Sequence, residues 1–151
     1  MSDDSVIVEH CRALWESYGT PPEHILPDAD DRVRSFIDEG RKSRRLAAFI
    51  AEDDGKPVAS SGCQIYISPY PEVIAPQYRL YGYVWAVFVE TEYRRRGVAR
   101  QLMERMVEYL KREGCTHIAL HSSEAARRLY GGMGFASGTE MRLSLAPQSS
   151  P

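Results

Sequence analysis

The chain has 151 residues, of which 43% are hydrophobic and 26% charged, which is enough apolar material for the core of one globular domain, 1–151. A formal net charge of −2 at pH 7 excludes a protein that binds nucleic acid through overall positive charge. Its three cysteines are well separated, which argues against a disulfide framework, and its acidic start argues against a secretion signal. No apolar run approaches the ~20 residues of a membrane span, so we expect a cytoplasmic protein.

Two helices are expected first, over residues 4–18 and 30–42, because apolar residues recur in both at helical spacing. Residues 45–52 and 58–68 are predicted to be strands, and the turn "DDGKP" between them predicts a hairpin. The proline-rich "PYPEVIAPQ" that follows is predicted to be a loop, and loops of this length usually carry function.

The second half begins with "YGYVWAVFVE", residues 81–90, which is apolar at nearly every position and is predicted to be a strand buried on both faces. Four elements complete the order: a clear helix over 98–112, a strand "THIALHS", a short helix in "SEAARRLYGGMGF" and a closing strand "TEMRLSL". Residues 146–151 are expected to be a frayed tail. This order predicts a mixed α/β fold whose helices can cover both faces of one sheet, with the strands around the 98–112 helix parallel.

The stretch "RRRGVAR", residues 94–100, concentrates positive charge between a buried strand and a helix. The first N–H groups of a helix and its dipole favour an anion such as phosphate, and a glycine lets the backbone approach it closely. Cations at that end are disfavoured by roughly 0.3–1 kcal/mol each, which indicates an anionic partner. The alternative is that the arginines only solvate the helix start. The pattern is neither a Walker loop nor a dinucleotide-binding fingerprint.

Residues Arg94 to Ala99 resemble the Gln/Arg-x-x-Gly-x-Gly/Ala signature of the GNAT superfamily of acyl-CoA N-acyltransferases. The preceding "VFVETEY" is similar to the fourth strand of that family, and "LYGGMGF" to its Leu-Tyr-x-x-x-Gly-Phe segment. The resemblance implies a central, mixed and mostly antiparallel sheet that is splayed at the fourth strand, with helices on both faces. The family usually opens with a strand before its first helix, and this chain begins almost at the helix, which leaves open whether the first edge strand exists.

The resemblance also implies that acetyl-CoA is the acyl donor. Backbone N–H groups and arginine side chains would bind its pyrophosphate, and its pantetheine arm would pair with the strand edge before the arginines. Ser123 stands where the family often has Asn, and it could bind the cofactor or only cap the helix. We expect no metal, since His10, His24 and His117 have no paired ligands. The cofactor-binding residues implied are Val87, Phe88, Val89, Arg94, Arg95, Arg96, Gly97, Val98, Ala99, Arg100 and Ser123.

The implied reaction is direct attack by a primary amine on the thioester. A lysine-like amine has a pKa of about 10.4, so a base must remove its proton. By resemblance, Tyr130 would protonate the leaving thiolate; the alternative is a core tyrosine. His121 is the candidate base because the ordinary pKa of histidine, about 6.5, suits that task, although a structural histidine is the alternative. A water relay and three weaker candidates stay open, namely Tyr81, Tyr83 and Glu90.

The two N-terminal helices and residues 66–83 are expected to form the wall of the acceptor site, with an aromatic-lined pocket in which Glu72 faces a cation. A small amine, an antibiotic-like amine, an amino acid and a peptide N-terminus all remain open as acceptors. A regulatory acyl-CoA-binding module that transfers nothing is the rival function. Nucleic acid and membrane are not expected as partners, and a homodimer is plausible for the family although no residue indicates it.

Overall fold

The computed structural model describes residues 3–145, and its tertiary contacts divide them into two compact units, 3–121 and 122–145. The single domain expected over 1–151 stays a prediction. The tail 146–151, expected to be frayed, lies outside the described residues. Within residues 3–145, the helices are too short or too polar to cross a membrane.

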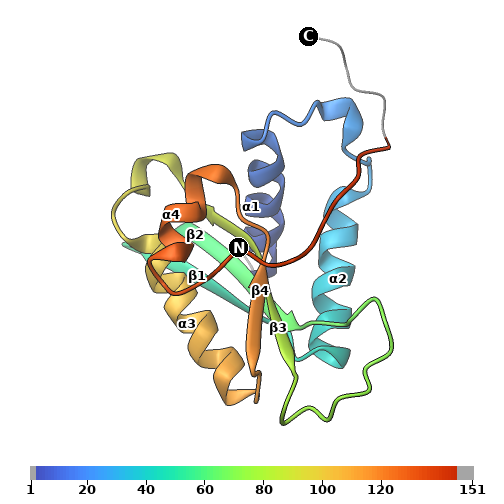
Figure 1. Ribbon diagram of the computed structural model, residues 1–151. Coiled ribbons are helices and arrows are strands. Elements are labelled where there is room, and N and C mark those ends of the chain that lie inside the picture. The colour runs from blue at the N-terminus through green and yellow to red at the C-terminus, as the bar shows by residue number, and fades with distance from the viewer. Residues whose placement is uncertain (1–2, 146–151) are drawn as a thin grey trace. The chain divides into compact units, whose positions relative to one another are not determined.

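The first unit is a four-stranded sheet with three long helices (Figure 1). Its strands lie in chain order β1-β2-β3-β4, with the first two pairings antiparallel and the β3–β4 pairing parallel. The sequence predicted the β1–β2 hairpin and the parallel pairing of β3 with β4. Short 3-10 turns at Pro22–His24 and Thr91–Tyr93 lead into α2 and toward α3. The elements are α1 (Asp3–Ser17), α2 (Ala29–Ser43), β1 (Ala47–Asp53), β2 (Lys56–Ile65), β3 (Tyr81–Val89), α3 (Val98–Arg112) and β4 (His117–Leu120).

Helices cover both faces of this sheet, with α1 and α2 on one face and α3 on the other (Figure 1). On the first face, the Phe36 ring of α2 meets the Trp85 ring of β3 edge-on at 5.3 Å. On the second face, Leu110 of α3 lies so close to Gly82 that a Cβ there would be 2.7 Å from the Leu110 Cδ1. Neighbouring β3 residues point to opposite faces, so this strand carries both contacts.

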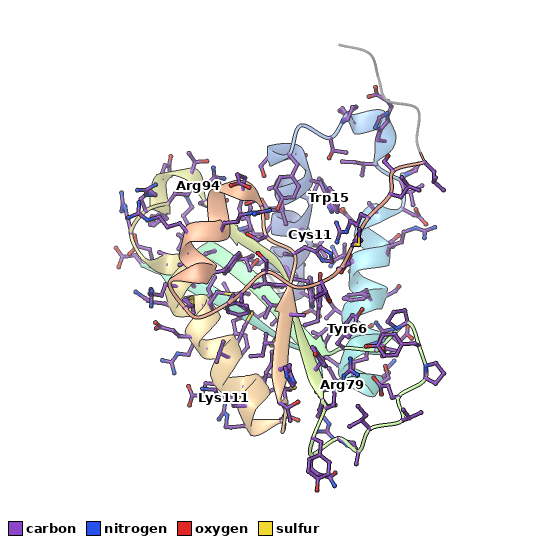
Figure 2. All side chains as sticks on the ribbon, in the orientation of Figure 1. Cys11, Trp15, Tyr66, Arg79, Arg94 and Lys111 are labelled. Carbon is purple, nitrogen blue, oxygen red and sulfur yellow. The ribbon has the colours of Figure 1, made fainter. Side chains whose placement is uncertain are left out.

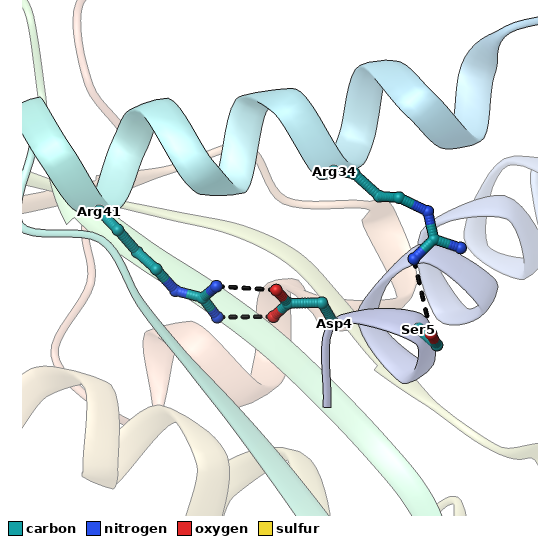
Figure 3. Close-up of polar contacts among 4 residues, drawn as sticks. All are labelled: Asp4, Ser5, Arg34 and Arg41. Carbon is teal, nitrogen blue, oxygen red and sulfur yellow. Dashed lines mark hydrogen bonds and ion pairs between the residues drawn. The ribbon is translucent and has the colours of Figure 1, made fainter. Parts of the chain in front are cut away.

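Charged side chains hold α1 against α2 (Figure 3). Arg41 of α2 donates two hydrogen bonds, of 2.7 and 2.6 Å, to the carboxylate of Asp4 on α1. This contact with Arg41 lowers the pKa of Asp4. Arg34 of α2 adds a longer bond of 3.5 Å to Ser5. The packing of the two helices therefore combines an apolar seam with a bidentate ion pair at the N-terminal end of α1.

The apolar seam is a cluster formed by Ile7 of α1, Ile37 of α2 and Leu46, which immediately precedes β1. Strand β3 is less buried than predicted, because most of its residues are half-buried and only Gly82, Val84 and Phe88 are buried. Strand β4 has four residues and pairs with only the first part of β3, so the second part has no neighbouring strand on that side. Among the described residues no strand precedes α1, so the sheet here begins after α2.

The second unit contains a 3-10 turn, Glu124–Ala126, and a short helix, α4 (Arg127–Gly131), where the sequence predicted a helix. The predicted closing strand over 139–145 was wrong, because this segment forms no helix or strand in the structure. Its alternation gives a potential apolar face, but a strand is stable only when a neighbour accepts its hydrogen bonds and covers that face. The apolar side chains of the segment are instead 84–94% exposed: Met141, Leu143 and Leu145.

Candidate active site

The C-terminal half of β3 has an edge that β4 does not cover. The parallel pairing joins Tyr81–Val84 to His117–Leu120 and stops there, although β3 continues to Val89. The β2–β3 register shifts just beyond this point, and Ala86 has a φ of +50°, so the strand carries a bulge. The edge of Val87–Val89 on this side can therefore pair with an extended amide-containing chain such as pantetheine, as the resemblance implied.

The loop that follows presents the start of α3. Gly97 has a φ of +83°, a conformation that favours glycine, and a Cβ placed on it would meet no heavy atom within 4 Å. The first hydrogen bond into the helix runs from Gln101 N–H to the Gly97 carbonyl at 3.1 Å. The N–H groups of Val98 and Ala99, which precede this bond, mark the positive end of the helix. Open space, glycine and helix end together fit a pyrophosphate.

The arginines of this loop have different roles, and all of them are exposed. Arg94 donates from Nε to the Val89 carbonyl at 3.0 Å, so it ties the loop back to β3 (Figure 2). Arg96 lies over the ring of Tyr93 at 5.2 Å, and Arg100 pairs with Glu104 at 3.6 Å. These contacts position part of the positive charge, and binding of phosphate by the arginine side chains stays a prediction.

The two candidate bases Tyr83 and His121 are brought together. The Tyr83 hydroxyl and His121 Nδ1 are hydrogen-bonded, and the Tyr83 ring stacks on Tyr66 at 5.6 Å. The parallel register explains the contact: Tyr83 pairs with Ala119, and His121 lies two residues further, on the same face. The third tyrosine candidate, Tyr81, lies elsewhere and stacks on His117 at 4.7 Å.

A second polar cluster joins His10, Ser60 and Glu90, and sequence reasoning missed it. His10 of α1 is 4% exposed, and its Nδ1 is 2.9 Å from the Ser60 hydroxyl of β2. Its Nε2 lies 3.7 Å from Glu90 Oε1 just after β3, and its ring lies 4.8 Å from Phe88. Burial lowers the pKa of His10, and Glu90 opposes that effect. The available signal was the spacing, since His10 stands three residues after Ile7 on the buried stripe of α1.

The other predicted residues lie in the second unit. Tyr130 of α4 is 7% exposed, and its ring lies 5.9 Å from that of Phe135. Ser123 does not cap the following turn with its side chain; its carbonyl accepts the Ala126 N–H at 3.1 Å. Capping by the Ser123 hydroxyl is therefore not observed.

The loop between β2 and β3 encloses a cavity of about 160 Å³ lined by Tyr66, Tyr70, Glu72, Arg79 and Tyr81, among others. The guanidinium of Arg79 lies over the rings of Tyr70 and Tyr81, at 5.6 and 5.5 Å. The tyrosines thus line a cavity, as predicted, and the cation on their faces is a side chain of the protein.

Neither metal nor thiol chemistry has a visible site in the part of the chain that the structure describes. Residues 3–145 contain no group of three or more His, Cys, Asp or Glu side chains that could hold a metal ion. Burial raises the pKa of the Cys63 thiol to about 12, so it stays protonated and is a poor nucleophile.

Comparisons with known proteins agree with this geometry. Residues 9–135 match the model of the Acetyltransferase (GNAT) family. The chain is similar to N-alpha-acetyltransferase 30 of Saccharomyces cerevisiae, with 37% identity over 93 residues, which is 58% of this chain and only half the length of that relative.

Two crystal structures share the fold at low identity. A GCN5-related N-acetyltransferase from Ralstonia eutropha JMP134 has 23% identity and a TM-score of 0.80, with 96% of this chain and 94% of that chain covered. A predicted acetyltransferase from Clostridium acetobutylicum, solved with acetyl-CoA, has 22% identity and a TM-score of 0.78, with 95% and 90% covered.

Proposed function

Because the chain belongs to the Acetyltransferase (GNAT) family, we propose that it transfers the acetyl group of acetyl-CoA directly to a primary amine. One observation carries the proposal: the uncovered edge of β3 runs through the Arg94–Arg96 loop straight into the exposed positive end of α3. An extended amide arm and a pyrophosphate lie in that order along coenzyme A. Strand edge and helix end therefore complement the two parts of one ligand.

The acyl donor would lie along Val87–Val89 with its pyrophosphate at the N–H groups of residues 95–100. A backbone N–H of the strand edge would donate to the thioester carbonyl and stabilise the negative charge that develops on its oxygen. Removing one such donor in other enzymes costs about 2.7–4 kcal/mol of transition-state stabilisation. Ser123 remains a further proposed contact to the donor.

The amine nitrogen forms the new C–N bond as the C–S bond breaks, and the amine loses one proton. We assign that proton to the Tyr83–His121 pair, directly or through water, because the hydrogen bond between them lets charge on one be stabilised by the other. The departing thiolate takes a proton in return, and Tyr130 is the proposed donor. Both assignments concern side chains and can be tested by substitution.

The proposal is tested by calorimetric titration with acetyl-CoA and CoA, followed by a thiol-release assay over simple amines, aminoglycosides, amino acids and peptides. The similarity to an N-alpha-acetyltransferase makes a peptide α-amine one acceptor to include. Micromolar binding with amine-dependent release is expected. Binding without release from any amine would instead favour the regulatory acyl-CoA-binding module, and no binding would contradict the donor site.

Three substitutions separate the proposed proton transfers. Tyr83→Phe and His121→Asn should each lower kcat by about 10²–10⁴-fold, the usual contribution of a general base, with the KM for acetyl-CoA nearly unchanged. Tyr130→Phe should lower kcat most for poorly nucleophilic amines. Unchanged kcat in all three variants would refute the assignments while leaving the donor site intact.

A further inference from the structure

A second and larger cavity lies between α1, the Pro22–His24 turn and the start of α2. Its volume is about 340 Å³, against about 160 Å³ for the cavity under the β2–β3 loop. Sites for small molecules usually begin near about 300 Å³. We refer to it as the helical pocket. Its walls are mainly apolar, formed by Val8, Trp15, Ile25, Leu26, Ala29 and Val33.

The charged groups around the helical pocket are paired with one another. Arg12 of α1 is hydrogen-bonded to Asp30 of α2, and Arg32 donates to Asp28 at 2.9 Å. The remaining ionisable wall group of α1 is Cys11, whose pKa is raised by burial and by Asp30, so the thiol is neutral. The charges of Arg12, Asp30 and Arg32 are therefore balanced, and His24 is a further polar group of the wall, at the turn. The mainly apolar surface of the pocket favours an uncharged hydrocarbon part of a ligand.

The two helices that line the pocket, α1 and α2, also pack near the bulged half of β3. Val33 lines the pocket and packs on the same core cluster as Trp85, the residue before the bulge. On α1, Cys11 lines the pocket while its neighbour His10 contacts Phe88 with ring centres 4.8 Å apart. The two helices that line the pocket therefore also contact residues 85–88, in the bulged half of the strand that forms the proposed transfer site: Phe36 of α2 meets Trp85, and His10 of α1 meets Phe88.

We infer that the helical pocket holds an uncharged apolar group of the acceptor, so that the preferred substrates are primary amines carrying an alkyl or aryl chain. This inference rests on the proposed acetyl transfer and names the acceptor class for it. The chain is removed from water in the pocket, while the amino group stays outside it toward β3. Amines with only polar substituents gain nothing there.

The test is acetylation of a series of linear primary amines, from ethylamine to hexylamine, at saturating acetyl-CoA. Each buried CH₂ should raise kcat/KM by about fourfold until the pocket is full. Ala29→Phe, which fills the pocket, should lower kcat/KM for hexylamine by about tenfold or more while leaving that for ethanolamine within about twofold. Ala136→Phe makes the same exchange at an exposed position outside the expected acceptor wall and should change neither.

A binding measurement without turnover accompanies the assay. Trp15 is a wall residue of the pocket and is 54% exposed, so hexylamine should change its fluorescence, and Ala29→Phe or Trp15→Phe should abolish the change. Equal kcat/KM along the series, or equal effects of Ala29→Phe and Ala136→Phe on hexylamine, would overturn the inference. Transfer to no amine at all would overturn the proposed function and, with it, the role of the helical pocket in acceptor binding. The change in Trp15 fluorescence with hexylamine would still decide whether the helical pocket binds an apolar amine.

Discussion

His10 is expected to be a main link between α1 and the donor strand, and His10→Ala tests this. Replacing the ring with a methyl group leaves the Ser60 hydroxyl, in a residue that is 2% exposed, without its hydrogen-bond partner. A buried unsatisfied hydroxyl costs about 1–3 kcal/mol. The ring also loses its contact with Phe88 and leaves a cavity. We therefore expect the free energy of unfolding to fall by about 2–4 kcal/mol.

The assay is urea unfolding followed by circular dichroism, at a pH of about 8, where histidine is neutral. The double variant His10→Ala/Ser60→Ala completes a cycle. Removing both partners leaves no unsatisfied hydroxyl, so the double variant should lose about 1 kcal/mol less than the sum of the single losses. His24→Ala is the matched control, because His24 is exposed, and it should change stability by less than about 0.5 kcal/mol.

The reasoning would be refuted by a loss in His10→Ala no larger than that in His24→Ala. It would equally be refuted by single losses that add up in the double variant, since additivity means that His10 and Ser60 do not interact. A normal His10→Ala fold with a raised KM for acetyl-CoA would show in addition that α1 positions Phe88 and Glu90 for donor binding.

Three further outcomes follow from the same structure. As the pH falls below about 6.5, the unfolding free energy of the wild type should decline relative to that of His10→Ala. Burial lowers the pKa of His10 in the folded state, so the unfolded chain binds the proton first. A difference in unfolding free energy between the two proteins that does not change with pH, measured by urea titration, would contradict this. Gly97→Val should weaken CoA binding by about tenfold or more in calorimetry. Gly55→Val, with a similar φ of +76° in the β1–β2 turn, should leave CoA binding unchanged. Equal CoA affinities of the two variants would count against the proposed pyrophosphate site. Gly62→Ala places a Cβ 2.2 Å from Trp85 Cζ2 and should destabilise the fold by about 1–3 kcal/mol in thermal unfolding; a neutral change would mean that the Trp85 ring moves freely.

The difference between local patterns and long-range contacts explains which predictions succeeded. Helical spacing in 98–112 gave α3 with its bounds, because a helix is made of contacts within four residues. The turn at Asp54 and Gly55 likewise gave the β1–β2 hairpin. The strand expected over 139–145 was wrong because alternation describes the segment alone, and a strand also needs a paired neighbour.

Local patterns in the sequence were therefore enough for the order of the elements up to residue 131, and for the arginine–glycine loop at the start of α3. Tertiary structure alone decided which side chains meet. Tyr83 and His121 are 38 residues apart and are joined by strand register, while His10 and Ser60, 50 residues apart, are joined by the packing of α1 on the sheet. The helical pocket also exists only once α1 and α2 have packed together. Periodicity reports which face of an element is apolar, but the identity of the partner on that face depends on the register and packing of the whole fold.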